Sequence, residues 1–380
     1  MKAFLVWDGG DSVRVPPSLG APLPDQLTGT PGEQLIEIGT RACYDSLGRD
    51  DEGNRKGRST ANTLKNVLDV KHFSVLEHYA RTFELAWDGD YGELLEATAN
   101  RPGIFTRFDG QHWRITANVR AVIEWDTWSV RLGMQHFEYP VGVANAVGAY
   151  VKNCMHQVVP LLVGEPDWHN DAFWGDNPNK HRVSAKLVEP ETNAERMVSM
   201  FLVGSRGFSH EMVRHRFAIS QCSTRYCAED TSPWHWHPLI DQYLDETDDD
   251  TMSILLGVAQ DQSQQTYRDI VEKLEVWLLT HLPEDTPYRL KTARKQARGA
   301  ARGFLGNALE TQMVFSAPVW AWKHIAHMRA ADAADAEIRE IIADAVRELK
   351  TCRYAPEFAD LDLGPASDGI GRSLVSGGHA

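Results

Sequence analysis

The sequence has no run of about eighteen apolar residues, so it predicts no membrane-spanning helix. Its opening residues turn acidic at Asp8, which does not match a secretory signal peptide. Positive charge is also scarce, because 53 acidic residues against 39 lysines and arginines leave a formal net charge of −14 over 380 residues. We therefore expect a soluble, cytoplasmic protein that binds neither membranes nor nucleic acid.

Cysteine is rare, with five residues in the chain, and their spacing matches no zinc motif. In a cytoplasmic protein this odd number indicates reduced thiols rather than a disulfide framework. His235 and His237 alternate as two metal ligands on a strand could, but no third ligand is evident. Packing with the neighbouring tryptophans is therefore the preferred interpretation, and no metal is expected. The sequence also lacks a P-loop, and residues 369–372 (GIGR) lack the third glycine of a dinucleotide fingerprint.

One short segment, residues 205–227 (SRGFSHEMVRHRFAISQCSTRYC), concentrates arginine, histidine and hydroxyl side chains. We expect a helix as far as about Arg216, with His210 and Arg214 four positions apart on one face. Guanidinium groups present planar forks of donors that match phosphate and the carbonyl edges of a pyrimidine or a flavin. The segment therefore indicates a site for a planar, anionic ligand. The alternative is a solvated helix end whose cations oppose the helix dipole.

The order of residues in this segment resembles the signature of the flavin-dependent thymidylate synthases. In that family Arg-His-Arg is followed by seven residues and then by Ser-x-Arg-Tyr. Here six residues separate the triplet at 214–216 from the motif at 223–226. Further elements similar to those of the family occur in the same order along the chain. They are residues 40–45 (TRACYD), residues 71–78 (KHFSVLEH) before a strand expected at 82–85, residues 301–305 (ARGFL), and Arg329.

The resemblance implies an enzyme that methylates C5 of a uracil nucleotide. Methylenetetrahydrofolate would supply the carbon, FAD would carry the hydride and NADPH would be the reductant. The substrate-binding residues that the resemblance implies are Glu211, Gln221, Ser223, Arg225, Arg302 and Arg329. It implies catalytic roles for Ser223 and Arg329, and Arg329 would polarise the uracil ring, because the family uses no cysteine nucleophile.

The same resemblance implies a flavin site around the Arg-His-Arg triplet. The flavin-binding residues that it implies are Cys43, His72, Ser74, Arg214, His215, Arg216 and His324. We expect His215 to be neutral, because the arginines on either side repel a second positive charge.

The middle of the chain departs from the family pattern. About 135 residues separate the first elements from the triplet, so residues 88–195 are expected to form an insertion or a partial internal duplication. The chain also has Pro318 and Trp320 where the family carries an Asn-x-Arg flavin contact. Asn118 and Arg120 are candidates to replace that pair. The alternative is a capping asparagine beside a surface arginine.

These features predict an α/β (α+β) fold in which helices flank an antiparallel-rich sheet. We expect one domain over residues 1–380, with a flexible tail at 365–380. Arg294, Arg298 and Arg302 repeat every four residues and so share one face of a helix. A second helix is predicted from an apolar stripe. The stripe consists of Ile338, Ile341, Ile342, Val346 and Leu349.

The resemblance also implies a homotetramer whose active sites are shared between chains. Departures from the family at Glu211, Gln221 and Cys222 favour UMP as a substrate, as in relatives that methylate UMP or dUMP during nucleoside-antibiotic biosynthesis. Two alternatives stay open. One is a standard dTMP synthase, and the other is a nucleotide-binding flavoprotein that has lost methyl transfer.

Overall fold

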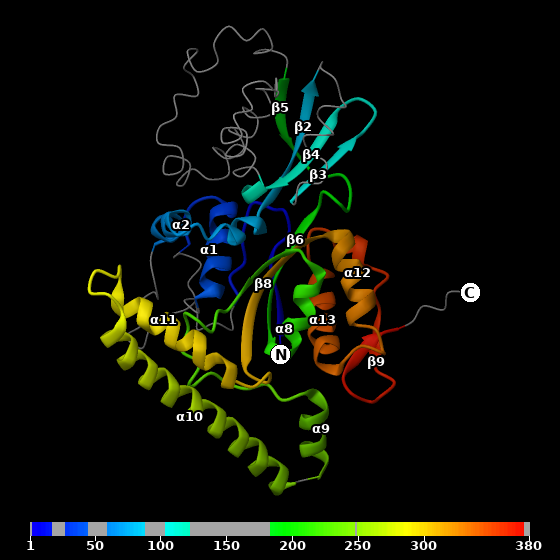
Figure 1. The fold of residues 1–380 in the computed structure, drawn as a ribbon. Helices are drawn as coiled ribbons and strands as arrows, with labels where there is room; N and C mark the ends of the chain where they lie inside the picture. The colour runs from blue at the N-terminus through cyan, green and yellow to red at the C-terminus, as the bar shows by residue number, and fades with distance from the viewer. Residues whose placement is uncertain are drawn as a thin grey trace.

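An antiparallel sheet of four strands, in the order β1-β6-β8-β7, lies at the centre of the chain (Figure 1). Its strands are β1 (Lys2–Trp7), β6 (Met197–Ser205), β7 (Ala218–Gln221) and β8 (Glu310–Pro318). The structure is a computed structural model, and it describes residues 2–16, 27–44, 59–87, 103–121, 183–247 and 249–375. The predicted mixture of helices and antiparallel sheet is confirmed.

Each face of the central sheet is covered by its own set of helices. On β6, Met200 and Leu202 belong to one core, and Phe201 and Val203 belong to the other, as the alternation of a strand requires. The first core contains α12 (Val319–Arg329), α13 (Ala336–Leu349) and part of α8 (Arg206–Met212). The second core contains α1 (Pro31–Cys43), α2 (Thr60–Asp69) and the 3₁₀ turn η2 (Phe73–His78).

Local signals in the sequence account for several of these elements. Helix α1 begins with a capping box between Thr30 and Glu33, with Pro31 in the first turn. The apolar stripe predicted for α13 is confirmed, because all five of its side chains are at most 1% exposed. The strand predicted at 82–85 lies within β2 (Ala80–Trp87).

A second antiparallel sheet has the order β3-β4-β2-β5. Strands β3 (Ile104–Phe108), β4 (Trp113–Asn118) and β5 (Val183–Val188) all come from the region expected to be an insertion. Arg114 on β4 forms a buried ion pair with Glu195, at 3.2 Å between Nε and Oε1. Of residues 88–195, the structure describes only 103–121 and 183–195, so the remainder of this expected insertion lies outside the described residues.

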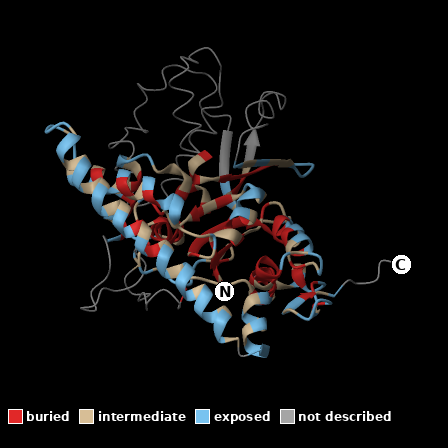
Figure 2. Cartoon of the chain, turned by 60° about the horizontal axis from the view of Figure 1, so that its bottom comes forward, coloured by how far each residue is buried: buried red, intermediate tan, exposed pale blue. Residues whose placement is uncertain are grey.

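A helical arm extends along one side of the central sheet. It contains α9 (Pro238–Thr247), the long helix α10 (Asp250–His281), α11 (Arg289–Ala301) and the 3₁₀ turn η4 (Arg302–Phe304). Figure 2 shows that most of α10 is exposed, and only Gln264 and Tyr267 along it are buried. The predicted cationic face is largely confirmed, although Arg302 begins the 3₁₀ turn rather than continuing the helix.

The end of the chain is ordered further than expected. After the 3₁₀ turn η5 (Ala355–Phe358), strands β9 (Leu363–Pro365) and β10 (Arg372–Leu374) pair as a hairpin. The buried Arg339 holds this hairpin, because its Nη2 donates to both carboxylate oxygens of Asp368 and to the carbonyl oxygen of Ile370. The expectation of a flexible tail therefore does not fit residues 365–375, and residues 376–380 lie outside the described residues. No helix in the described part of the chain is long and apolar enough to span a bilayer.

Candidate active site

The segment that carries the Arg-His-Arg triplet is not one continuous helix. Helix α8 ends at Met212, and a 3₁₀ turn, η3 (Val213–His215), follows it. Arg216 then adopts a left-handed backbone with φ of 57°, which ends the helical segment before β7. The prediction that the α-helix reaches Arg216 and aligns His210 with Arg214 is therefore wrong. Arg214 and Arg216 are both exposed.

Arg329, at the end of α12, connects two of the predicted site residues. Its Nη1 lies 2.6 Å from Oε2 of Glu211, and its Nε donates to Nε2 of His215 at 3.2 Å. Because a guanidinium nitrogen can only donate, Nε2 of His215 must accept and therefore carries no proton. Burial lowers the pKa of His215 to about 4, and the charges of Arg329 and His324 contribute to the shift. The expected neutral form is confirmed, but burial and Arg329 are its causes rather than the flanking arginines.

A second group of predicted residues meets around the loop after β7. The backbone N–H of Ser223 donates to the carbonyl oxygen of Cys43 at 3.0 Å, and the ring of Tyr226 packs edge-on against Tyr44, 5.1 Å between centroids. The Tyr44 hydroxyl lies 3.5 Å from Nδ1 of His72. Three elements that are far apart in the sequence therefore come together, as their resemblance to one family predicted.

Burial favours the neutral forms of the thiol and the imidazole in this group. Burial raises the pKa of Cys43 to about 11, and burial lowers the pKa of His72. Ser74, on η2, is half-buried. The carbonyl oxygen of Ser223 accepts bonds from the backbone N–H groups of Tyr226 and Cys227, which closes the loop into a tight turn.

The two groups lie on opposite faces of the central sheet. On β7, Ser220 points to the α1 face, where its hydroxyl bonds His78 at 2.7 Å. The next residue, Gln221, points to the other face and donates to Ser209 of α8 at 2.8 Å and to Thr311 at 3.2 Å. Glu211, Gln221 and Arg329 are thus separated by the sheet from Ser223 and Cys43. Arg225 and Arg302 are exposed.

Asn118 and Arg120 make the contacts expected of a capping asparagine and a surface arginine, rather than contacts that point to a flavin. Oδ1 of Asn118 accepts a bond from the backbone N–H of Ala121 at 2.8 Å, as a capping asparagine does. Nη1 of Arg120 pairs with Oε1 of Glu77 at 2.5 Å. Both side chains already have partners within the chain.

Two small groups of possible metal ligands occur among the described residues. His235 and His237 bind different carboxylates, Glu310 at 2.6 Å and Asp335 at 3.1 Å, so they do not form one site.

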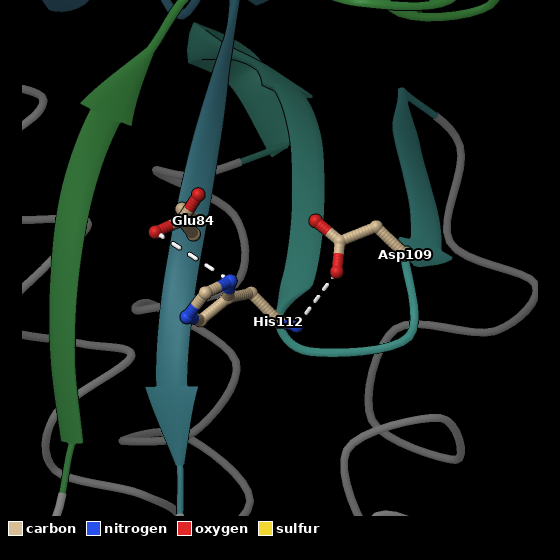
Figure 3. Close-up of side chains that lie close together, drawn as sticks. All are labelled: Glu84, Asp109 and His112. Atoms are coloured by element: carbon tan, nitrogen blue, oxygen red, sulfur yellow. Dashed lines mark hydrogen bonds and ion pairs between the residues drawn. The ribbon is translucent and has the colours of Figure 1, made fainter.

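Glu84, Asp109 and His112 bring ligand-type atoms within 4.8 Å of one another at the second sheet (Figure 3). Asp109 accepts bonds from the backbone N–H groups of residues 111 and 112, which closes the β3-β4 hairpin. Its carboxylate therefore has a structural role in the turn.

Sequence reasoning missed three features of the site. Tyr44 and Tyr226 lie within the quoted motifs, but nothing in a single sequence indicates that their rings pack together. Buried His78 bonds Ser220 and Ser316, and burial lowers its pKa to about 3. Lysines 291 and 295 lie beside Arg225, and their spacing of four residues on α11 was a usable signal.

Comparison with known proteins gives one family for the second half of the chain. Residues 179–356 match the family model Thy1, described as thymidylate synthase complementing protein. Flavin-dependent thymidylate synthases from Mycobacterium sp. (strain KMS) and Mycobacterium avium (strain 104) are 38% and 37% identical over 174 residues. These alignments cover 45% of this chain and 65% and 64% of the two relatives.

A third relative of the same name, from Mycobacteroides abscessus, is 38% identical over 167 residues, which is 43% of this chain and 61% of the relative. The matched region thus spans less than two thirds of the relatives' length. The region matched by the family model includes the Arg-His-Arg triplet, the 223–226 loop, Arg302 and Arg329, but not Cys43 or His72. Residues 179–356 of this chain are therefore similar to the thymidylate synthase complementing protein family and to these flavin-dependent thymidylate synthases.

Proposed function

We propose that this protein catalyses the reductive methylation of C5 of a uracil nucleotide. The observation that carries the proposal is the packing of the 223–226 loop against Cys43 and Tyr44, with His72 beside them. Those N-terminal residues lie outside the region matched by the family model, yet they meet the matched loop in space. The residues of three motifs that are distant in the sequence thus lie in one place, as a shared binding site requires.

The donors around the triplet fit a flavin nucleotide such as FAD. Exposed Arg214 and Arg216 offer planar forks for phosphate or ring oxygens, and neutral His215 adds no competing charge. Bound FAD would carry the hydride that NADPH provides, and methylenetetrahydrofolate would provide the carbon.

Arg329 is the proposed group that polarises the uracil ring. Its bonds to Glu211 and His215 fix the guanidinium plane, and its side chain is 20% exposed, so it can still reach a ligand. A fixed donor stabilises negative charge that develops on a carbonyl oxygen without reorganisation. Ser223, Arg225 and Arg302 would bind the sugar and phosphate.

UMP is the proposed preferred nucleotide, which would place the protein in specialised metabolism such as nucleoside-antibiotic biosynthesis. Glu211 supports this preference, because its carboxylate can only accept hydrogen bonds and a ribose hydroxyl can donate one. A 2′-deoxyribose lacks the 2′-hydroxyl donor. Glu211→Met, which removes both acceptor oxygens, should therefore lower kcat/KM for UMP more than for dUMP.

The contacts of Arg120 favour one competing function. The pairing of Arg120 with Glu77 supports a structural role for Arg120 rather than replacement of the Asn-x-Arg flavin contact missing at Pro318 and Trp320. A nucleotide-binding flavoprotein without methyl transfer would be consistent with that loss.

Mass spectrometry of the products separates these functions. The protein is incubated with FAD, NADPH, methylenetetrahydrofolate and an equal mixture of UMP and dUMP. One added methyl group on UMP supports the proposal, and methylation of dUMP alone indicates a standard dTMP synthase. A yellow protein that methylates neither nucleotide would contradict methyl transfer.

We also propose that the complete site needs a second copy of the chain, in a homotetramer. The substrate residues lie on two faces of one sheet, and α10 exposes large apolar side chains, including Ile254 at 66% and Trp277 at 53%. Arg225→Ala and Arg329→Ala should each be inactive alone. If each site draws on two chains, an equal mixture should recover about a quarter of the activity. Failure to recover any activity after subunit exchange would contradict shared sites.

A further inference from the structure

A cationic groove lies between the 223–226 loop and helix α11. Its volume is about 460 Å³, and its lining includes Arg225, Tyr226 and residues of α11 from Arg289 to Arg298. Six of the residues that line the groove are arginine or lysine, and no lining residue is aspartate or glutamate. In a chain with a net charge of −14, this concentration of positive charge needs a physical reason.

Three of the six cationic side chains bind other groups within the chain. Arg289 donates to the carbonyl oxygen of Leu279 at 2.5 Å, at the end of α10. Arg294 pairs with Glu275 at 3.0 Å. Arg298 donates to the carbonyl oxygen of Tyr226, which ties α11 to the loop.

The other three cations, Arg225, Lys291 and Lys295, form no ion pair with any residue in the described part of the chain. The Nζ atom of Lys295 lies 4.8 Å from the centre of the Tyr226 ring, which holds the ammonium group beside the loop. Lys291 is exposed one helical turn away. These three side chains can therefore bind an anionic ligand.

The number and spacing of these charges exceed what one phosphate requires. Lys291 and Lys295 are four positions apart on α11, which is about 6 Å along the helix axis, and Arg225 lies on the other side of the groove. A nucleotide monophosphate held at Arg225 and Arg302 would leave Lys291 and Lys295 without an anion.

We propose that the groove binds an extended polyanion, a flexible chain of several phosphates or carboxylates. The inference deepens the proposed function and rests on it, because two co-substrates of that reaction could provide such a chain. One source is a nucleotide with more than one phosphate, and the other is an oligoglutamate tail on the reduced folate. Both present successive anions to Lys295 and Lys291.

Calorimetric titration of the full-length protein with inorganic phosphate and with tripolyphosphate, at constant ionic strength, tests the groove directly. Tripolyphosphate should bind at least about tenfold more tightly than phosphate. The double variant Lys291→Gln/Lys295→Gln should lose that difference. The control Lys65→Gln/Lys186→Gln, which removes the same charge from exposed positions on α2 and β5, should keep it.

Equal binding of phosphate and tripolyphosphate, or equal loss in both double variants, would overturn the proposal. Tighter binding of a single-stranded oligonucleotide than of tripolyphosphate, at equal phosphate concentration, would overturn it as well, in favour of a nucleic-acid surface.

Two kinetic comparisons identify the source of the polyanion. A lower KM for pentaglutamyl than for monoglutamyl methylenetetrahydrofolate, lost in Lys291→Gln/Lys295→Gln, assigns the groove to the folate tail. The same pattern for UTP against UMP assigns it to the nucleotide.

The tripolyphosphate titration and the methylation assay test the groove and the proposed reaction separately. Methylation without a preference for tripolyphosphate refutes only the groove, and the preference without methylation refutes only the reaction.

Discussion

Replacing Arg329 with methionine tests the centre of the proposed mechanism. The methionine keeps the apolar stem but removes both donors, the one 2.6 Å from Glu211 and the one 3.2 Å from His215. Loss of one fixed donor to developing negative charge typically reduces kcat about 100- to 1000-fold. We expect a fall in kcat/KM of that size for UMP in a steady-state assay.

The fold should tolerate this change. The ion pair is partly open to solvent, with side chains 20% and 32% exposed, so its loss should cost only about 1 kcal/mol of unfolding free energy. Urea denaturation followed by circular dichroism measures that cost. Arg329→Lys keeps a positive charge without the planar fork, so it should recover only a small part of the activity.

The pKa of His215 gives a readout that is independent of turnover. It lies near 4, and the charge of Arg329 is one of the causes after burial. Arg329→Met should therefore raise this pKa, whereas Arg329→Lys should leave it low. Titration followed by NMR, with His215→Asn to assign the resonance, measures the shift. If Arg329→Met kept more than a third of the wild-type kcat/KM, or left the pKa unchanged, the proposed role of Arg329 would be refuted.

Three further predictions concern the groups that hold the fold and the site together. Arg114→Met should cost about 1.5–3 kcal/mol in urea denaturation, because it removes the buried partner of Glu195 and leaves that buried carboxylate with Arg107 and backbone donors only; Arg107→Met, at a position 25% exposed, is the control and should cost clearly less. His78 has a pKa of about 3 when folded and an ordinary value near 6.5 when unfolded, so its contribution to stability is present above pH 6.5 and is lost as the pH falls. That contribution should fall by about 2 kcal/mol between pH 7 and pH 5, and His78→Asn should flatten this part of the pH profile; an unchanged profile in His78→Asn would contradict the assignment. Maleimide at pH 7.5 should modify Cys222 before Cys43 and Cys352, because burial raises the pKa of the latter two thiols to about 11; peptide mass spectrometry gives the order, and early labelling of Cys43 would contradict it.

Local sequence patterns predicted the helices and strands whose conformation depends mainly on neighbouring residues. The stripe of α13 repeats at the period of a helix, so the sequence alone indicates which of its side chains are buried, whereas on β2 the adjacent Thr82 and Phe83 are both buried and alternation predicts only the strand. The end of the α8 segment was mispredicted, since no residue type in it requires the left-handed backbone at Arg216. The tail was mispredicted for a similar reason, because a serine- and glycine-rich stretch gives no sign of its bond to buried Arg339.

The site could be predicted only as far as the resemblance reached. The order of the motifs predicted that Cys43, His72 and Ser223 would come together, although the contacts that join them span up to 180 residues (223 minus 43). The pair at Asn118 and Arg120 shows the limit of a short motif. Asn-x-Arg specifies two side chains, but Glu77 and the backbone of Ala121 decide what those side chains bind.

The length of the six-residue spacer between the triplet and Ser223 determines which side chains of β7 lie on each face of the central sheet. Successive side chains of a strand point to opposite faces, so Ser220 reaches His78 on one face and Gln221 reaches Thr311 on the other. One more residue within the strand would exchange these two faces. The family's seven-residue spacer therefore cannot place the same residues in the same contacts unless the extra residue is accommodated outside the paired strand. The six-residue spacer therefore places Gln221, rather than Ser220, on the side of the sheet that carries Glu211 and Arg329.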